Sequence, residues 1–434
     1  MPPHSVPPGI PGSKMPGEAE RQLRRMVAEL LERDTDRFPG AQPISFAREH
    51  LHELQRSEYF MCEKTDGIRC LLFLTFSNNE DGSFRAEHFF IDRKNNFYQV
   101  PPGLHFPHNS EPHNETIFTY GTLLDGELVH DFVANDPRPR LMFYIFDCLA
   151  VDGENITKKP LDKRLGKLHV NFFEPLSIWR QRHPEAQGRA PFHVKLKAVH
   201  SPYHVSDMFK HILPTLPHGN DGLIFTCKST PYRFGTDEHI LKWKPPQENT
   251  IDFKLRLGEF PTFDPQDGEE GEIPDFDAMP DRFMLLVQHS NNQYKPFQHD
   301  LYIEEAEWEI LKALEQPLDG RIIECYREPS GRWRYKREED GTPRWRDDKK
   351  DANHISTVNS VLESIEDPVT EEDLIAAEGR IKEAVHALRA RDAAAAQARQ
   401  RQEAENIQRR RRDMEVRGDA EQEAKKRKLS NGID

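Results

Sequence analysis

Cysteines and long apolar runs are both scarce in this sequence. Five cysteines occur in 434 residues and no two of them form a C-x-x-C pair, which argues against a zinc ribbon. They lie in apolar or strand-like surroundings, so we expect reduced thiols in an intracellular protein. No apolar run approaches the roughly 18–20 residues that cross a bilayer. The N-terminal MPPHSVPPGIPG has no apolar signal core. We therefore expect neither a membrane partner nor secretion.

Positive net charge is also missing. The chain has 74 acidic and 60 basic residues, a formal net charge of -14. This balance argues against a protein that coats nucleic acid non-specifically, although it leaves room for a local basic cleft. Apolar residues make up 36% of the chain, enough for real cores, and the length fits two domains plus tails.

Changes in composition and in hydrophobic pattern divide the chain into five segments. Pro245-Pro246 fixes two φ angles and removes two hydrogen-bond donors, which predicts a boundary between two domains. The expected segments are an N-terminal arm at 1–20, a first domain at 21–244, a second domain at 245–354, a helix packing back on the first domain at 355–391, and a charged tail at 392–434.

Hydrophobic periodicity gives the expected elements. Strands are predicted at 69–76, 87–92, 141–150, 221–226, 239–244, 251–257, 282–289 and 320–328, with a hairpin turn at 95–96. Helices are predicted at 23–31, at 304–315 and from 370 onward, where the stretch beyond 392 is either a solvated helix or disordered. The acidic run 261–280 is expected to be a mobile surface loop.

The stretch EKTDGIR contains the first candidate for chemistry. Lys64 has an amine that can attack an α-phosphate and form a phosphoamide. Asp66 can hold the local turn, Gly67 can tolerate a positive φ, and Arg69 can bind ribose or phosphate oxygens. Alone, a Lys followed by Asp-Gly is more often a solvated turn.

Four further segments follow in order and change that interpretation. They are LDGE at 124–127, FYIFD at 143–147, DGLI at 221–224 and LKWK at 241–244. Strand alternation puts Lys242 and Lys244 on one face, where two cations suit a phosphate chain. Each segment alone also fits an ordinary strand, but all five in this order indicate a nucleotide-binding site.

As a set, these segments resemble the covalent nucleotidyltransferase superfamily, which includes ATP-dependent ligases and mRNA capping enzymes. Within this superfamily, the residues of these segments are similar to those of the fungal-type mRNA guanylyltransferases. KTDGIR, IDRKNNFY, TLLDGELV, YIFDCLAVDG, DGLIFT, ILKWKP and the distal WRDDK carry the resemblance, over about 60–350. It implies an α+β fold, in which a nucleotidyltransferase domain of ATP-grasp-like antiparallel sheets and helices precedes a C-terminal OB-fold domain.

The resemblance also implies a two-step reaction. Lys64 would attack the α-phosphate of GTP and release pyrophosphate, and the GMP would then pass to the 5′-diphosphate end of nascent RNA to give a GpppN cap. Mg²⁺ or Mn²⁺ would suit the oxygen ligands that the sequence offers.

The implied roles cover both domains. For the nucleoside, Arg69 and Glu127 would hold the ribose, Phe146 would stack on guanine, and Lys197, with Lys195 as its rival, would select guanine; Asp66 and Arg93 are further nucleotide-binding candidates. For the phosphates, Lys242 and Lys244 would contact the α-phosphate, and Asp221, with Glu127, would bind the metal. From the second domain, Arg346, Asp348 and Lys349 would orient the leaving pyrophosphate.

The partners and the location are also expectations. The sequence has no His-Cys-x5-Arg loop of a cysteine phosphatase and no alternating glutamates of a metal-dependent triphosphatase, so a separate RNA 5′-triphosphatase subunit is expected. Capping enzymes also dock on the phosphorylated C-terminal tail of RNA polymerase II. The basic cluster Lys158, Lys159, Lys163, Arg164 and Lys167 is a candidate for that contact or a plain solvated helix. The basic run 425–428 is either a nuclear import signal or an ordinary charged tail; we expect a nuclear protein.

Two alternatives remain open at this point. An ATP-dependent polynucleotide ligase uses the same architecture, but ligases usually have Glu where this chain has Asp221, and an N-terminal DNA-binding domain would have no room. A non-catalytic RNA-binding scaffold is the second alternative, and the intact set of Lys64, Glu127, Lys242 and Lys244 argues against it.

Overall fold

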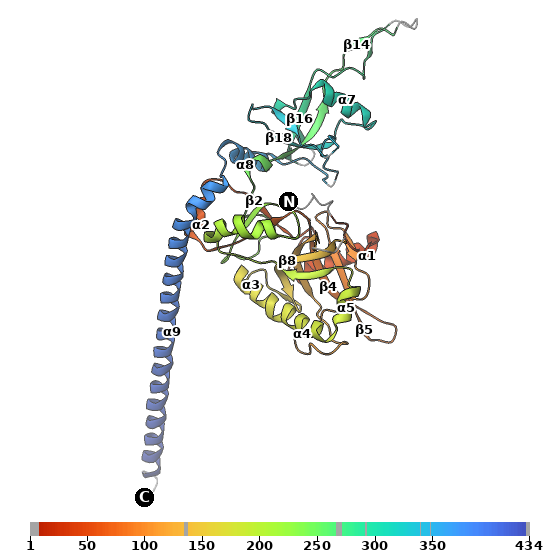
Figure 1. Ribbon diagram of the computed structural model, residues 1–434. Coiled ribbons are helices and arrows are strands. Elements are labelled where there is room, and N and C mark those ends of the chain that lie inside the picture. The colour runs from red at the N-terminus through yellow and green to blue at the C-terminus, as the bar shows by residue number, and fades with distance from the viewer. Residues whose placement is uncertain are drawn as a thin grey trace.

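Two β-rich bodies stand one above the other in the computed structural model, and a long helix runs past the lower one (Figure 1). The structure describes residues 8–133, 138–265, 271–290, 293–338, 340–347 and 349–430. The lower body has two sheets with helices on their faces, and the upper body has one sheet and a projecting hairpin (Figure 1).

The larger sheet has eight strands. Its order is β1 (Ser13–Lys14), β6 (Phe97–Gln99), β5 (Phe84–Ile91), β4 (Ile68–Asn78), β7 (Thr122–Asp131), β8 (Arg140–Val151) and β10 (His193–Leu196), with β9 (Glu154–Asn155) paired to β8. All pairs are antiparallel except β8 with β10.

Both faces of this sheet are buried. In β4, Leu72 and Leu74 pack into one hydrophobic cluster, and Leu71 and Phe73 pack into another, as the two-residue period of a strand requires. The first cluster includes residues of α3 (Leu161–Leu168), η1 (His169–Phe173) and α4 (Glu174–Arg182). The second includes residues of α1 (Gly17–Leu30). Helices therefore cover both faces, which explains why the middle of β4, from Cys70 to Leu74, is entirely apolar.

The second sheet has four strands and meets the first near the candidate site. Its order is β2 (Ala41–Ser45), β12 (Gly235–Trp243), β11 (Asn220–Cys227) and β3 (Tyr59–Thr65). Only the β12–β2 pair is parallel. Short helical elements lie between the strands: α2 (His50–Arg56), α5 (Pro184–Arg189), η2 (Pro202–His204), α6 (Val205–Asp207), η3 (Met208–Ile212) and η4 (Leu213–Thr215).

The upper body contains a five-stranded sheet of order β17 (Gln293–Asp300), β16 (Phe283–Ser290), β13 (Ile251–Leu257), β18 (Ile322–Arg327) and β19 (Trp333–Tyr335). A bridge between Leu301 and Trp333 brings the two outer strands together. Helix α7 (Glu305–Ala313) connects the third and fourth of these strands in chain order. The bridge links the two edges of this five-stranded sheet, and the OB-fold stays a prediction for this body.

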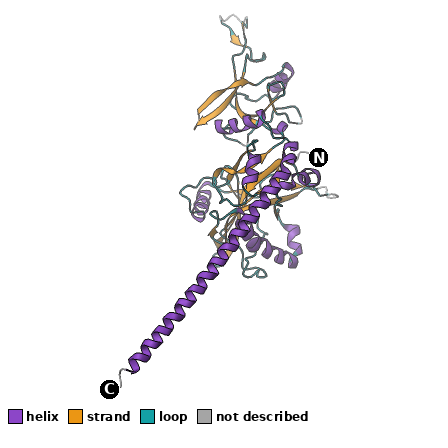
Figure 2. Cartoon of the chain, turned by 90° about the vertical axis from the view of Figure 1, so that its left-hand side faces the viewer, coloured by secondary structure: helices purple, strands orange, loops and turns teal. Residues whose placement is uncertain are grey.

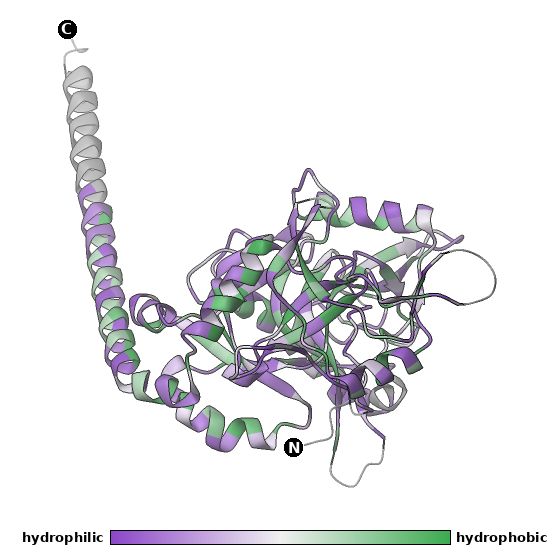
Figure 3. Cartoon of the chain, turned by 90° about the horizontal axis from the view of Figure 1, so that it is seen from above, coloured by the Kyte–Doolittle hydropathy of each residue, from purple (hydrophilic) through white to green (hydrophobic). Residues whose placement is uncertain are grey.

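Two elements mark the join between the bodies. Strand β12 ends at Trp243, and η5 (Pro246–Glu248) follows directly, before β13 starts the upper body. Helix α8 (Ile355–Glu366) then leads back to α9 (Glu371–Ser430), whose first turns lie against the lower body (Figures 1 and 2). Seen from above, the hydrophobic green segments gather toward the middle of the molecule, and the outer loops are mostly purple (Figure 3).

Most of the predicted elements are confirmed, and one prediction was wrong. Within 261–280, the described residues form an antiparallel pair, β14 (Thr262–Phe263) with β15 (Ile273–Pro274), so the prediction of a loop throughout was wrong. Helix α9 continues to Ser430, which decides between a helix and disorder for most of the C-terminal stretch. The turn at 95–96 is confirmed: Asn95, with φ 63°, lies between β5 and β6.

Candidate nucleotidyltransferase site

Lys64 lies near the end of β3, next to the segment that begins β11. Its Nζ donates a hydrogen bond to Asp221 Oδ1 at 2.6 Å, and Lys244 Nζ lies 2.8 Å from the other oxygen, Oδ2. Antiparallel pairing of β3 with β11 and of β11 with β12 brings these three side chains together. One carboxylate thus holds two lysines that are 180 positions apart in the sequence.

The charges at this point lower two pKa values, which favours the ionised form of Asp221 and disfavours the ammonium form of Lys242. Burial would raise the pKa of Asp221, but Lys244 and Lys64 lower it to about 2. Burial, and then Lys244 and Lys64, lower the pKa of Lys242 to about 8. The predicted phosphate-binding lysines therefore lie in one cationic site, and Lys242 is the cation that burial and its neighbours destabilise.

Arg69 is held from several sides by the protein itself. Its Nε and Nη2 donate to the two oxygens of Asp125 at 3.0 and 2.6 Å, and Tyr232 donates to Asp125 Oδ2 at 2.6 Å. The guanidinium carbon lies 5.3 Å from the centre of the Phe146 ring. Asp125 and Tyr232 were not predicted as site residues. The features of the sequence that could have indicated them are the carboxylate inside the LDGE segment, which is buried, and the Tyr just before β12.

Glu127 lies opposite Arg69 in the β4–β7 pair. Burial raises the pKa of Glu127, and Lys197, Lys64 and Arg93 act against that rise. Four of the predicted site residues therefore interact with this carboxylate, although they come from different strands and loops.

Of the two rival lysines, Lys197 is the one beside the candidate nucleophile. It is 4% exposed, and its Nζ donates a hydrogen bond to Thr65 Oγ1, on the residue after Lys64. Lys195 is exposed, and its Nζ lies 5.6 Å from the centre of the Tyr144 ring. Thr65 was missed at the sequence level, because a threonine at the end of a strand carries no signal of its own.

Glycine at two positions permits close backbone approach. Gly67 does not have a positive φ, so that expectation was wrong; a Cβ there would meet Leu128 O at 2.4 Å. Gly222 has φ +138°, and a Cβ would meet Trp243 O at 2.0 Å. Gly67 therefore lets the loop after Lys64 lie against β7, and Gly222 lets the segment that carries Asp221 lie against β12.

The predicted residues of the upper body are paired with acids there. Arg346 Nη1 lies 3.3 Å from Asp252 Oδ1, and Lys349 Nζ also pairs with Asp252. Asp252 is 4% exposed and lies on β13. Lys349 is close enough to Lys242 to contribute to its lowered pKa, so the two bodies face each other across the site. Asp348 lies outside the described residues.

The predicted basic cluster at 158–167 is not a free cationic surface. Arg164 is 2% exposed and pairs with Asp147 at 2.7 Å, so it belongs to the core. The lysines all have acidic partners: Lys158 with Glu32, Lys159 and Lys167 with Glu154, and Lys163 with Asp162.

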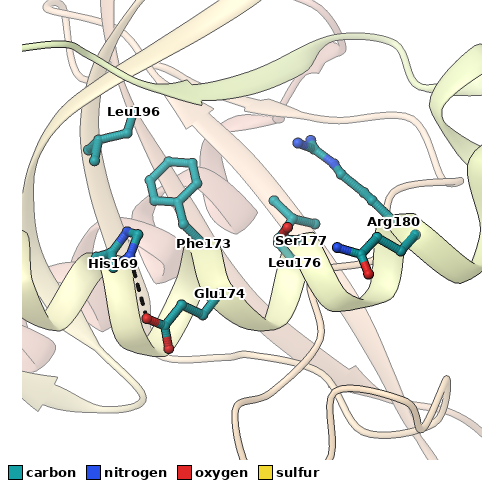
Figure 4. A pocket seen from close by; sticks show the side chains of 8 residues that line it. His169, Phe173, Glu174, Leu176, Ser177, Arg180 and Leu196 are labelled. Atoms are coloured by element: carbon teal, nitrogen blue, oxygen red, sulfur yellow. Dashed lines mark ion pairs between the residues drawn. The ribbon is translucent and has the colours of Figure 1, made fainter.

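A separate cavity of about 620 Å³ lies on η1 and α4. Phe173, Leu176 and Arg180 line it, and it contains none of the candidate site residues (Figure 4).

A metal ion at this site would need phosphate oxygens from a bound nucleotide, in addition to protein carboxylates, to complete its coordination. Within the described ranges, no three His, Cys, Asp or Glu side chains gather closely enough to hold one. Mg²⁺ typically takes one or two protein carboxylates together with phosphate oxygens and water, so Asp221 alone satisfies the protein's share. The same part of the chain has no helix both long and apolar enough to cross a bilayer.

A lysine amine among cations and carboxylates lies at the seam of two largely antiparallel sheets, below the five-stranded sheet of the upper body, and this arrangement is typical of nucleotidyltransferases. Family models place the chain more narrowly. The mRNA capping enzyme catalytic domain matches residues 7–246, and the mRNA capping enzyme C-terminal domain matches residues 248–375. The chain belongs to the mRNA capping enzyme family.

Curated relatives agree with this assignment. The mRNA-capping enzyme subunit alpha of Neurospora crassa is 43% identical over 385 residues, which cover 86% of this chain and 92% of that protein. The subunits of the same name from Yarrowia lipolytica and Schizosaccharomyces pombe are also 43% identical, over 87% of this chain and 91% and 89% of theirs. A solved Chlorella virus DNA ligase-adenylate is similar with a TM-score of 0.26 and 11% identity, covering 68% of this chain and 97% of that one.

Proposed function

We propose that this protein is an mRNA guanylyltransferase. The observation that carries the proposal is Asp221 paired with both Lys64 and Lys244, with Lys242 close to the two lysines, in a chain of the capping enzyme family. In the first step the Lys64 Nζ lone pair forms a bond to the α-phosphorus of GTP. The bond from that phosphorus to the bridging oxygen breaks, and pyrophosphate leaves. In the second step a terminal oxygen of a 5′-diphosphate RNA attacks the same phosphorus, and the P–N bond breaks.

The nucleoside would bind between β7 and the segment after β10. Arg69 and Glu127 would hold the ribose, with Asp125 fixing the guanidinium of Arg69 in place. Phe146 would stack on the base. Lys197 Nζ has three N–H donors, one on Thr65 and one toward Glu63, which leaves a third for the 6-oxo group of guanine. Adenine has a 6-amino donor there, so the same lysine would reject it.

The phosphates would bind at the cationic side of the site. Lys242 and Lys244 would contact the α-phosphate, and Asp66 and Arg93 would border the phosphates. Mg²⁺ or Mn²⁺ at Asp221, supported by Glu127 nearby, would supply further positive charge against the developing negative charge. Most of the rate enhancement would come from positioning and electrostatics.

The upper body would act by closing over the triphosphate. Arg346 and Lys349 now pair with Asp252, so the leaving pyrophosphate would replace one carboxylate with a group that carries more charge. Asp348, between them in the sequence, is proposed for the same role. Pro245 and Pro246 would serve as the hinge between a nucleotidyltransferase domain at 21–244 and an OB-fold domain at 245–354.

Partners follow from the chemistry and from the relatives' names. Those relatives are called subunit alpha, and we propose a separate RNA 5′-triphosphatase as the second subunit of this enzyme. The phosphorylated tail of RNA polymerase II is proposed as a docking partner and the nucleus as the location. The basic run 425–428 would be the import signal; its side chains lie outside the described residues.

Covalent labelling tests the proposal directly. Incubation with GTP labelled at the α-phosphate and Mg²⁺, followed by denaturation, should leave label on the wild type, whereas ATP should leave none. Lys64→Ala should abolish the label. Lys158→Ala, an exposed lysine paired with Glu32, is the matched control and should label normally. Labelling of Lys64→Ala by GTP would refute this nucleophile, and labelling by ATP alone would favour a ligase.

A further inference from the structure

A buried polar network lies directly behind the candidate nucleophile. Glu63, the residue before Lys64, is 5% exposed, and its Oε1 lies 3.6 Å from Lys197 Nζ. Lys197 also donates to Thr65, the residue after Lys64. Lys64 is therefore flanked in sequence by two residues that both hold Lys197. Glu63 belongs to β3 of the four-stranded sheet, whereas Lys197 directly follows β10 of the eight-stranded sheet, so the contact crosses the seam between the sheets.

A second layer of the network holds Glu63 from the other side. His218 Nε2 lies 3.7 Å from Glu63 Oε1, and its Nδ1 lies 2.8 Å from Asp131 Oδ1. The Tyr144 hydroxyl donates to Asp131 Oδ2 at 2.7 Å, and the Tyr144 and His218 rings are 4.8 Å apart. Asp131 is the last residue of β7, the strand that also carries Glu127.

The charges in this network balance. Glu63, Asp131, Lys197 and His218 are each at most 7% exposed, and buried ionised groups are stable only when they are paired. Burial would lower the pKa of His218, but Asp131 and Glu63 raise it; burial would raise the pKa of Glu63, but His218 and Lys197 lower it. Lys197 and His218 thus each lie beside a carboxylate that favours their protonated form.

One nitrogen in the network still has unused hydrogen-bonding capacity. His218 Nε2 is buried and has no hydrogen-bond partner in the part of the chain that the structure describes. It is directed at Glu63 from 3.7 Å, beyond hydrogen-bond distance. Site hydrogen bonds that are long without substrate commonly shorten when substrate binds. A small movement of Glu63 toward His218 would therefore complete the chain from Asp131 to Lys197.

We propose that His218 and Asp131 are positioning residues that act through Glu63 to fix the Lys197 ammonium, and so set the preference for purines with a 6-oxo group. The inference rests on the proposed function, because it deepens the role of Lys197. A lysine side chain has a flexible four-carbon stem, so its ammonium keeps one direction only when other groups hold it. Glu63 and Thr65 fix its end, and the second layer fixes Glu63.

The proposal has a kinetic signature. A contact to the base is made in both the bound substrate and the transition state, so weakening it should raise KM and leave kcat nearly unchanged. The effect should also vanish for a nucleotide without the 6-oxo group. 2-Aminopurine riboside triphosphate is such a probe, since it keeps the ring and the 2-amino group. A purely structural defect would instead affect both nucleotides equally.

Tyr144→Phe, Asp131→Asn and His218→Gln test the network in the full-length protein. In self-labelling kinetics, the kcat/KM ratio of GTP to the 2-aminopurine nucleotide should fall about tenfold in Asp131→Asn and His218→Gln. Tyr144→Phe removes only one hydroxyl, so it should fold normally and lower the ratio less. His88→Gln is the matched control, because His88 is a buried histidine on β5 outside the network, and it should leave the ratio unchanged.

Each outcome bears on the proposal. Unchanged ratios in the three network variants, together with a lowered ratio in Lys197→Met, would overturn the positioning role and leave the role of Lys197 intact. An unchanged ratio in Lys197→Met would instead remove the base contact on which the proposal rests. Absence of GTP labelling in the wild type would refute the proposed function itself. Thermal melting of Tyr144→Phe identifies any loss that comes from unfolding.

Discussion

At the scale of single residues, the charged groups of the site differ in how they affect the stability of the folded protein. Asp221 gains two lysine partners, whereas Lys242 is buried among cations. A lysine whose pKa falls from 10.5 to about 8 on folding destabilises the folded protein by about 3 kcal/mol at neutral pH. The proposed phosphate-binding role of Lys242 would therefore oppose stability, as is common where a site must bind a highly charged ligand.

Replacement of Lys242 tests this directly. Because the folded pKa is depressed, the penalty is complete below about 8 and disappears as the pH rises toward 10.5. Lys242→Met should raise the free energy of unfolding by about 2–3 kcal/mol at pH 7, less at pH 10, and abolish self-labelling. Urea unfolding at both pH values measures it. Lys244→Met should destabilise instead, because Asp221 raises the pKa of Lys244 despite burial. A Lys242→Met variant less stable than the wild type at pH 7 would contradict this account.

At the scale of elements, helix α9 has two parts with different roles. Its first turns bury Leu374, Ala377, Ile381 and Val385 in the core of the four-stranded sheet, and Trp243 on β12 donates to Val369 O just before the helix. Residues 391–409 are exposed. The buried side chains of the first turns are therefore a packing surface of the lower body, and the exposed stretch begins where the helix leaves that body.

Two isoleucines on this helix give a matched pair of mutations. Ile381→Ala removes a side chain that is 1% exposed and should destabilise the protein by about 2–5 kcal/mol. Ile407→Ala, at a position that is 48% exposed, should change stability by less than about 0.5 kcal/mol. Thermal or urea unfolding measures both. Equal effects of the two substitutions would mean that the helix does not pack as described.

At the scale of the whole molecule, charged residues of the two bodies face each other across the candidate site. Lys349 is close enough to Lys242 to affect its pKa, and Arg344 interacts with Asp66 across the same gap. Arg346 and Lys349 remain paired with Asp252. GTP offers these cations a stronger partner, which is the physical reason to expect the upper body to move toward the lower one.

Small-angle scattering can test this closure. GTP with Mg²⁺ should lower the radius of gyration of a Lys64→Ala variant, which binds without reacting. The additional changes Arg346→Ala and Lys349→Ala should reduce the response by removing the cations that the triphosphate attracts. ATP is the control nucleotide and should cause little change. A radius that is the same with and without GTP would rule out closure.

The sequence alone determined the elements and the chemical class of this protein. Local periodicity fixed most strands and helices, because burial on one or two faces leaves a short-range pattern. Seven short segments in order indicated the family, because as a set they match one kind of nucleotide-binding site. Tertiary structure alone decided the pairings: Asp221 with Lys64 and Lys244, Asp125 with Arg69, and His218 with Glu63. These partners come from strands far apart in the chain, and only the seam between two sheets brings them within a few ångströms. Burial also decided which lysine lies beside the nucleophile, since Lys195 and Lys197 look alike in sequence while only Lys197 is buried.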